Sequence, residues 1–165
     1  MTEEWRVIGI FPGCTVYEVS DTGRVRNAKT GRILRLYKDR DGYLRAHLQV
    51  FKQSRYVYSH RMVIEAFVSP RPPSMMVDHI DGNRLNNVPS NLRWVTRSMN
   101  AQNRRSIHVK TRTGLLGATP CKGGMFMAKI RKGSVSYHLG TFATAQAAHE
   151  AYVAAKRTIH EGCTL

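Results

Sequence analysis

Glycine-containing turns divide the first 55 residues into short segments. Between them lie four short runs rich in β-branched and aromatic residues, at VYEVS (16–20), RVRN (24–27), RILRLY (32–37) and YLRAHLQVF (43–51). The dividing sequences DTG, KTG and RDG are typical of tight reversals between neighbouring strands. The pattern therefore predicts a small antiparallel sheet at the N-terminal end of the chain.

The next fifty residues have a different pattern, with a helix followed by strand, loop, strand and helix. Ser59 and Ser98 are the expected N-caps of the two helices, because Ser is favoured at that position. These elements are expected at SHRMVIEAFV (59–68), MMVDHI (75–80), DGNRLNN (81–87), NLRWVT (91–96) and SMNAQNRR (98–105).

A third pattern follows residues 106–112, a linker that contains basic residues and no acidic one. Three short runs, LLGATP (115–120), MFMAKIR (125–131) and VSYHLGTF (135–142), are expected to be strands. From about residue 145, small residues recur at helical spacing, which lets a helix pack closely on a sheet. We therefore expect an α+β chain of three modules, at 1–55, 56–105 and 113–165, with 106–112 as linker.

The charge of the chain restricts its partners. Its 165 residues include 26 Lys and Arg against 11 Asp and Glu, a net charge of +15. Such an excess favours a polyanion, nucleic acid first and a membrane surface second. No apolar run approaches the roughly 20 residues needed to span a bilayer, and the acidic N-terminus does not resemble a signal peptide. Three widely spaced cysteines without a CxxC pair fit a reducing compartment, so we expect a cytoplasmic protein.

The central module contains residues suited to phosphodiester hydrolysis, which needs an activated water and a cation on the phosphate. Mg²⁺ keeps several waters, so two protein oxygens suffice, and Asp78 and Asn100 could supply them. His79 suits the general base, since an unperturbed pKa of about 6.5 leaves neutral imidazole near pH 7. Neighbours in a strand point to opposite faces, so the strand must end or distort at His79.

The second ring nitrogen of His79 needs a partner that fixes the ring. A backbone carbonyl of the loop, or the amide of Asn91, could serve. Asn83, Asn86 and Asn87 are interpreted as turn formers, since Asn tolerates such backbone conformations.

The stretch DHIDGNRLNNVPSNLRWVTRSMN (78–100) resembles the ββα-metal motif of HNH endonucleases, in the form found in phage and intron-encoded homing enzymes. The resemblance implies that His79 is the general base and that Asn91 holds the loop and the base. It implies Asp78 and Asn100 as ligands of one divalent ion, Mg²⁺ first, with Mn²⁺ as a substitute. It also implies hydrolysis to 5′-phosphate and 3′-hydroxyl ends, with one strand nicked per active site.

The flanking segments resemble other modules of such enzymes. EEWRVI (3–8), the pattern GxxxYEVSDTGRVRN (13–27) and GRILRLYKDRDGYLRAHL (31–48) resemble the NUMOD4 DNA-binding module of phage nucleases. The run HLGTFATAQAAHEAY (138–152) resembles an AP2 DNA-binding domain, which implies a three-stranded sheet packed on one helix. Strand alternation then leaves Lys129, Arg131, Ser136 and His138 facing a DNA groove.

Double-stranded DNA is therefore the expected partner, bound by a monomer, with a dimer as the alternative. Further contacts are expected from the basic residues Arg24, Arg26, Arg61, Arg104 and Arg105 and from His60. For His60 a phosphate contact and a bond to the backbone at the helix start both remain open. The alternative function is an AP2-type DNA-binding regulator with a decayed nuclease, although each catalytic position is occupied by a competent residue.

Overall fold

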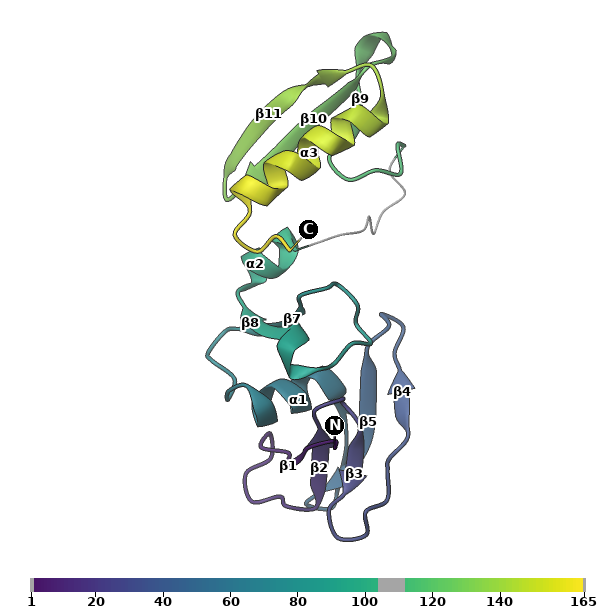
Figure 1. Cartoon of the computed structure of the whole chain (residues 1–165), viewed down its shortest axis with the longest axis vertical. Coiled ribbons are helices and arrows are strands. Elements are labelled where there is room, and N and C mark those ends of the chain that lie inside the picture. The colour runs from purple at the N-terminus through teal and green to yellow at the C-terminus, as the bar shows by residue number, and fades with distance from the viewer. Residues whose placement is uncertain (1, 104–111, 165) are drawn as a thin grey trace. The chain divides into compact units, whose positions relative to one another are not determined.

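The computed structural model describes residues 2–103 and 112–164. The chain forms two compact units, Met1–Val95 and Thr96–Leu165 (Figure 1). The elements of the first unit are β1 (Trp5–Val7), β2 (Tyr17–Ser20), β3 (Val25–Asn27), β4 (Leu36–Lys38), β5 (Leu44–Val50), β6 (Gln53–Tyr58), α1 (Ser59–Phe67), β7 (Met76–His79), the 3₁₀ turn η1 (Pro89–Asn91) and β8 (Leu92–Val95). The expected module boundary at 55/56 falls within β6.

The N-terminal strands pair antiparallel, as the turn pattern predicted, and they form two sheets, β1-β2-β3 and β4-β5-β6. Gly23, Gly31 and Gly42 of the expected turns have positive φ angles of 85°, 70° and 92°. The hairpin between β5 and β6 turns without glycine, at Phe51 and Lys52, whose φ angles are 48° and 62°. A turn built from such residues gives no glycine signal in the sequence, which is why β6 was not predicted.

One hydrophobic core joins these sheets to the helix that follows them. Helix α1 contacts strands of both N-terminal sheets and of the β7–β8 hairpin. Its Met62, Val63 and Ile64 are fully buried in the same cluster as Leu48 of β5 and Leu92 of β8. The expected first and second modules therefore share one core, which extends to Leu92 and Trp94 of β8.

Both predicted helix caps are wrong. The N-cap of α1 is Tyr58, and the Ser59 hydroxyl instead donates a hydrogen bond of 2.6 Å to the Gly23 carbonyl. The helix that follows β8 begins at Arg97, and its N-cap is Thr96, two residues before Ser98; the Thr96 hydroxyl accepts from the Met99 N–H. Ser59 does not cap α1 because its hydroxyl is bonded to a distant turn, and Ser98 does not cap α2 because the Thr96 hydroxyl already does so.

The second unit contains the expected three-stranded sheet packed on one helix. Its elements are α2 (Arg97–Gln102), β9 (Ala118–Pro120), the 3₁₀ turn η2 (Lys122–Gly124), β10 (Phe126–Lys132), β11 (Val135–Phe142) and α3 (Ala145–Ile159). The sheet order is β11-β10-β9, and α3 covers one face of it (Figure 1). Ala118, Ala128 and Ala148 form its small buried core. Among the described helices, none is long and apolar enough to cross a bilayer.

Candidate active site

The strand that carries Asp78 and His79 ends at His79, as predicted. The His79 carbonyl accepts a hydrogen bond of 2.9 Å from the Gly82 N–H, which reverses the chain at once. In the pairing of β7 with β8, Asp78 lies opposite Arg93 and His79 opposite Leu92. Both Asp78 and His79 are buried. The strand end thus places a carboxylate and an imidazole next to each other in the interior of the first unit.

Asn91 holds the loop that follows His79. Its Oδ1 accepts from the Asp81 N–H at 3.0 Å, and its Nδ2 donates to Asp81 Oδ1 at 2.9 Å and to the Asn86 carbonyl at 2.8 Å. The Asn91 carbonyl also accepts from the Ile80 N–H at 2.8 Å. This buried amide therefore joins both ends of the loop.

The ring of His79 is bonded to Asn87. His79 Nε2 lies 3.0 Å from Asn87 Oδ1, and Asn87 is only 2% exposed. An amide oxygen can only accept, so Nε2 carries the proton and the proton-accepting lone pair of the neutral ring is on Nδ1. The sequence predicts Asn87 only as a turn former, and nothing in the local pattern distinguishes it from Asn86.

The packing of Gly23 explains why Asn87 is held so firmly. A Cβ added at Gly23 would lie 2.8 Å from Asn87 Cβ and 2.9 Å from the Ser59 hydroxyl oxygen. The turn between β2 and β3 therefore packs directly against the residue that orients His79. A turn of the N-terminal sheet thus supports the loop of the β7–β8 hairpin.

Burial lowers the pKa of His79, an effect that the hydrogen bond to Asn87 and the nearby carboxylates of Asp81 and Asp78 partly oppose. Aromatic rings supply part of this apolar environment. The ring centroids of His60 and Tyr43 lie 5.3 and 5.9 Å from that of His79. A neutral imidazole near pH 7 follows, which is the form a general base requires.

His60 lies within the same ring cluster. Its ring is stacked on Tyr58 at 5.3 Å, and its Nδ1 is buried without a hydrogen-bond partner among the described residues. Burial, with a smaller contribution from His79, lowers the pKa of His60 to about 3. The phosphate contact expected for His60 stays a prediction.

Arg93 binds the carboxylate of Asp78. Its Nε and Nη2 lie 3.0 and 2.9 Å from Asp78 Oδ2. A buried carboxylate needs such compensation, because an unpaired charge in the interior is costly. Arg93 was not among the predicted site residues, although its cross-strand position opposite Asp78 was an available signal.

Asn100 lies in α2, in the second unit, where its N–H donates to the Thr96 carbonyl at 3.0 Å. Its expected partnership with Asp78 stays a prediction. Among residues 2–103 and 112–164, no three His, Cys, Asp or Glu side chains gather as a metal cluster. A Mg²⁺ site built from one or two protein oxygens and water needs no such cluster.

The arginines expected to contact DNA in the first unit have acidic partners. Arg24 forms an ion pair with Glu3, and Arg26 forms one of 2.6 Å with Glu18. Arg61 pairs with Glu65, one helical turn further along α1. Their predicted DNA contacts remain predictions, and such contacts would have to compete with these carboxylates.

The four residues expected to face DNA lie on one face of the C-terminal sheet. Lys129 lies opposite His138, and Arg131 lies opposite Ser136, so each pair projects to the same side. All four are exposed, whereas Ala128 and Ile130, which alternate with them along β10, are buried. Arg104 and Arg105 lie outside the described residues.

A helix, a two-stranded hairpin and a buried Asp-His pair at the strand end define an HNH-type nuclease segment. The HNH endonuclease family model matches residues 57–102, and the NUMOD4 motif matches residues 3–49. By these matches residues 57–102 form an HNH endonuclease segment and residues 3–49 a NUMOD4 motif. Both models lie within residues 3–102, so the resemblance of residues 113–165 to AP2 domains stays a prediction.

The similar proteins come from viruses. DNA endonuclease I-HmuI of Bacillus phage SP01 is 38% identical over 103 residues, which cover 62% of this chain and 58% of that protein. The uncharacterized HNH endonuclease L245 of Acanthamoeba polyphaga mimivirus is 36% identical over 101 residues, 61% of this chain and 29% of that protein. The chain spans less than two thirds of the length of both relatives.

A solved structure matches the fold of 61% of this chain. The structure described as DNA binding and cleavage by the HNH homing endonuclease I-HmuI matches with a TM-score of 0.55 and 38% identity, over 61% of this chain and 56% of that one. The antiparallel sheets and few helices of the α+β prediction are thereby confirmed.

Proposed function

We propose that this protein is a metal-dependent HNH DNA endonuclease of the homing type, which hydrolyses a phosphodiester in duplex DNA. The observation that carries the proposal is the state of His79. Its ring is buried at the end of β7, its Nε2 is bonded to Asn87 Oδ1, and its pKa is lowered. An imidazole so held is neutral, has a defined tautomer and is suited to accept a proton.

In the proposed reaction His79 acts as the general base. Its Nδ1 takes the proton of a water that attacks the phosphorus, while Asn87 keeps the ring from rotating. The Asn87 oxygen also stabilises the imidazolium that results, because it accepts the Nε2–H in both protonation states. Such general-base help contributes roughly 100- to 10,000-fold. The products would carry 5′-phosphate and 3′-hydroxyl ends.

Asp78 and Asn100 would hold the divalent ion, with Mg²⁺ first and Mn²⁺ as a substitute. Carboxylate and amide oxygens are the hard donors that Mg²⁺ prefers. Arg93 is bonded to Asp78 Oδ2, so it orients the carboxylate from the side of β8. When bound, the ion would stabilise negative charge on the phosphate and the leaving oxygen.

Duplex DNA is the proposed substrate. The proposed location is the cytoplasm or nucleoid of a bacterial cell that hosts a phage. The net charge of +15 supports a polyanionic partner. Lys129 and Arg131 on the C-terminal sheet make no ion pair with a carboxylate of the described residues. One HNH segment per chain gives one active site, so a monomer would nick one strand.

The test is a cleavage assay on supercoiled plasmid and long phage DNA, with Mg²⁺, Mn²⁺ or EDTA, followed by mapping of the ends. Metal-dependent conversion of supercoiled to nicked circles is expected, and it should be lost in His79→Ala. Tight DNA binding without cleavage in either metal would favour the alternative, a DNA-binding regulator with a decayed nuclease.

A further inference from the structure

Helix α2, which carries Asn100, is too short to be stable by itself. It spans six residues, Arg97–Gln102, and none of them is buried. Isolated helices shorter than about 12 residues are marginal in water, and most helical stability in proteins comes from tertiary packing. The stability of α2 therefore depends on residues that contact it from elsewhere in the second unit.

Residues 160–164, which we call the C-terminal segment, pack against the end of α2. The Gly162 N–H donates a hydrogen bond of 3.1 Å to Gln102 Oε1. The Thr164 hydroxyl donates to Oδ1 of Asn103, the C-cap of α2, and Asn103 is only 5% exposed. Figure 1 shows this part of the chain, which follows α3, beside α2. Two hydrogen bonds thus join the last residues of the chain to a helix that lies much earlier in the sequence.

Gly162 lies directly against the backbone of α2. A Cβ added at this buried glycine would overlap the Met99 carbonyl oxygen and would lie 3.0 Å from Met99 Cα. The Met99 carbonyl accepts a hydrogen bond of 3.1 Å from the Asn103 N–H, so it belongs to the last turn of the helix. Only a residue without a side chain permits two backbones to approach this closely.

The beginning of the C-terminal segment is fixed to strand β10. His160 Nε2 donates a hydrogen bond of 2.9 Å to the Arg131 carbonyl, which can only accept. Glu161 forms an ion pair of 2.9 Å with Lys132. The Cys163 N–H donates to the His160 carbonyl at 3.0 Å, which closes a turn within the segment. The C-terminal segment therefore connects α2 to a strand of the C-terminal sheet.

We propose that the C-terminal segment is a positioning element of the active site, which holds α2 and thereby fixes the backbone that carries Asn100. Asn100 directly follows Met99, the residue that Gly162 contacts. The inference rests on the proposed role of Asn100 as a ligand of the divalent ion. Mg²⁺ demands near-ideal octahedral geometry, so a loosened helix would weaken binding of the ion. The basic surfaces expected to contact DNA would stay unchanged.

The first test is Gly162→Ala in the full-length protein, studied without metal. Hydrogen exchange, measured by mass spectrometry on peptides that cover residues 96–103, should be about tenfold faster than in wild type. Gly9→Ala is the matched control, because Gly9 is exposed and has open space for a Cβ. Exchange of α2 should be the same in this control as in wild type.

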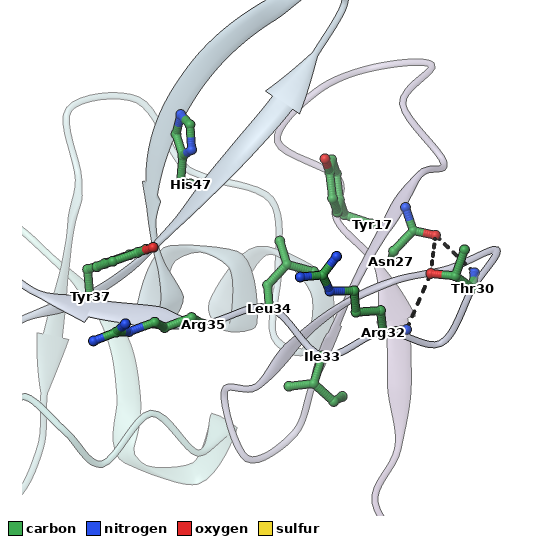
Figure 2. A pocket seen from close by; sticks show the side chains of 9 residues that line it. All are labelled: Tyr17, Asn27, Thr30, Arg32, Ile33, Leu34, Arg35, Tyr37 and His47. Atoms are coloured by element: carbon green, nitrogen blue, oxygen red, sulfur yellow. Dashed lines mark hydrogen bonds between the residues drawn. The ribbon is translucent and has the colours of Figure 1, made fainter.

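A milder variant, Thr164→Val, removes the hydroxyl that binds Asn103 without adding bulk. It should speed the exchange of α2 about threefold, whereas Thr164→Ser, which keeps the hydroxyl, should match wild type. Thr30→Val is the matched control. The Thr30 hydroxyl donates the same kind of bond to Asn27 Oδ1, at 3.1 Å, beside a groove in the first unit (Figure 2). Its loss should leave the exchange of α2 unchanged.

The second measurement is the affinity for Mg²⁺, by calorimetric titration in the presence of DNA. This affinity should fall about tenfold in Gly162→Ala, as is usual when a residue that orients a metal ligand is lost. The Kd for DNA in EDTA should stay within about threefold of wild type, because the phosphate contacts are unchanged. A loss confined to metal affinity distinguishes positioning of Asn100 from general destabilisation of the second unit.

Unchanged exchange of α2 in both Gly162→Ala and Thr164→Val would overturn the proposal. So would a metal affinity that falls in Asn100→Ala but not in Gly162→Ala, since the segment would then hold the helix without positioning the ligand. Unchanged metal affinity in Asn100→Ala would instead reject the proposed ligand, and with it this role of the segment. The exchange rates would still show whether the segment holds α2.

Discussion

The loop between β7 and β8 and the outer face of β10–β11 both contain polar residues, yet they differ in how those residues are satisfied. In this loop and the strand ends beside it, Asp78 is bonded to Arg93 and His79 to Asn87, and Asp78, His79 and Asn87 are buried. On the sheet, Lys129 and His138 are exposed side by side. The first region is ordered by its own hydrogen bonds, whereas the second leaves its charge exposed to solvent.

This difference separates two kinds of contribution to function. When a substitution removes one partner of a buried hydrogen bond, the polar group left behind is neither bonded nor solvated. Substitutions in the loop are therefore expected to change its geometry or the stability of the fold. An exposed lysine interacts weakly with its own protein, so its removal changes mainly the affinity for a polyanion. The following substitutions test that separation, from the largest expected effect to the smallest.

His79→Ala should reduce cleavage at least 100-fold, since it removes the general base. DNA affinity should stay close to wild type, because the basic surfaces are unchanged. A cleavage time course beside a gel-shift titration measures both. Cleavage within threefold of wild type would exclude His79 as the base. It would also mean that the buried region does not control cleavage separately from DNA affinity.

Asp78→Ala and Asn100→Ala should each remove metal-dependent cleavage, because two protein oxygens are all the expected site supplies. Asn100→His should retain some activity, since imidazole is also a metal ligand. Calorimetric titration of the metal in the presence of DNA should show weaker binding in both alanine variants. Unchanged metal affinity in either variant would remove that residue from the proposed ligands.

Asn91→Ala should lower the free energy of unfolding by about 1–3 kcal/mol, since a buried amide with three loop hydrogen bonds is lost. Asn86→Ala is the matched control: its half-buried side chain donates one hydrogen bond among the described residues, to Asp81 Oδ2, and its loss should cost under about 1 kcal/mol. Denaturant unfolding of the three proteins measures the difference. Equal losses would mean that the loop is not held by burial of Asn91.

His60→Phe should flatten the loss of stability in acid. The pKa of His60 is about 3 in the folded protein and about 6.5 unfolded, so between these values the unfolded chain binds the extra proton. Stability from this group is complete above about pH 6.5 and falls as the pH drops toward 3. Melting temperatures across that window should fall less in the variant. An unchanged pH dependence would show that His60 is solvated.

Lys129→Ala and Arg131→Ala should each weaken DNA binding modestly and lower the slope of log affinity against log salt by about 0.9. Arg24→Gln provides the comparison, since Arg24 is paired with Glu3 and a smaller change is expected. The measurement is affinity for target and scrambled duplexes across a salt series. If the slope of log affinity against log salt changed equally in all three variants, an ion pair with a carboxylate would not prevent an arginine from contacting DNA.

Much of the fold followed from local patterns. Gly23, Gly31 and Gly42 mark real reversals, because only glycine adopts positive φ without strain. The hairpin at Phe51 and Lys52 escaped prediction for the same reason, since it turns without that residue type. The correct cap of α2 was also available locally, at Thr96, but Ser98 was an equally suitable side chain two residues away.

The sequence predicts Asp78, His79 and Asn91 as site residues, because their types and spacing form a motif, and their roles stay predictions. The tertiary structure alone decided which asparagine is bonded to His79. Asn83, Asn86 and Asn87 are alike as turn residues, and only the approach of Gly23 from a distant turn buries Asn87 against His79. It also decided which arginines are paired, since Arg24 binds Glu3 and Arg26 binds Glu18. Arg35 and Arg45 instead lie over the rings of Tyr37 and Tyr56. Local spacing determines backbone conformation and residue chemistry, whereas burial and pairing depend on contacts between segments far apart in the chain.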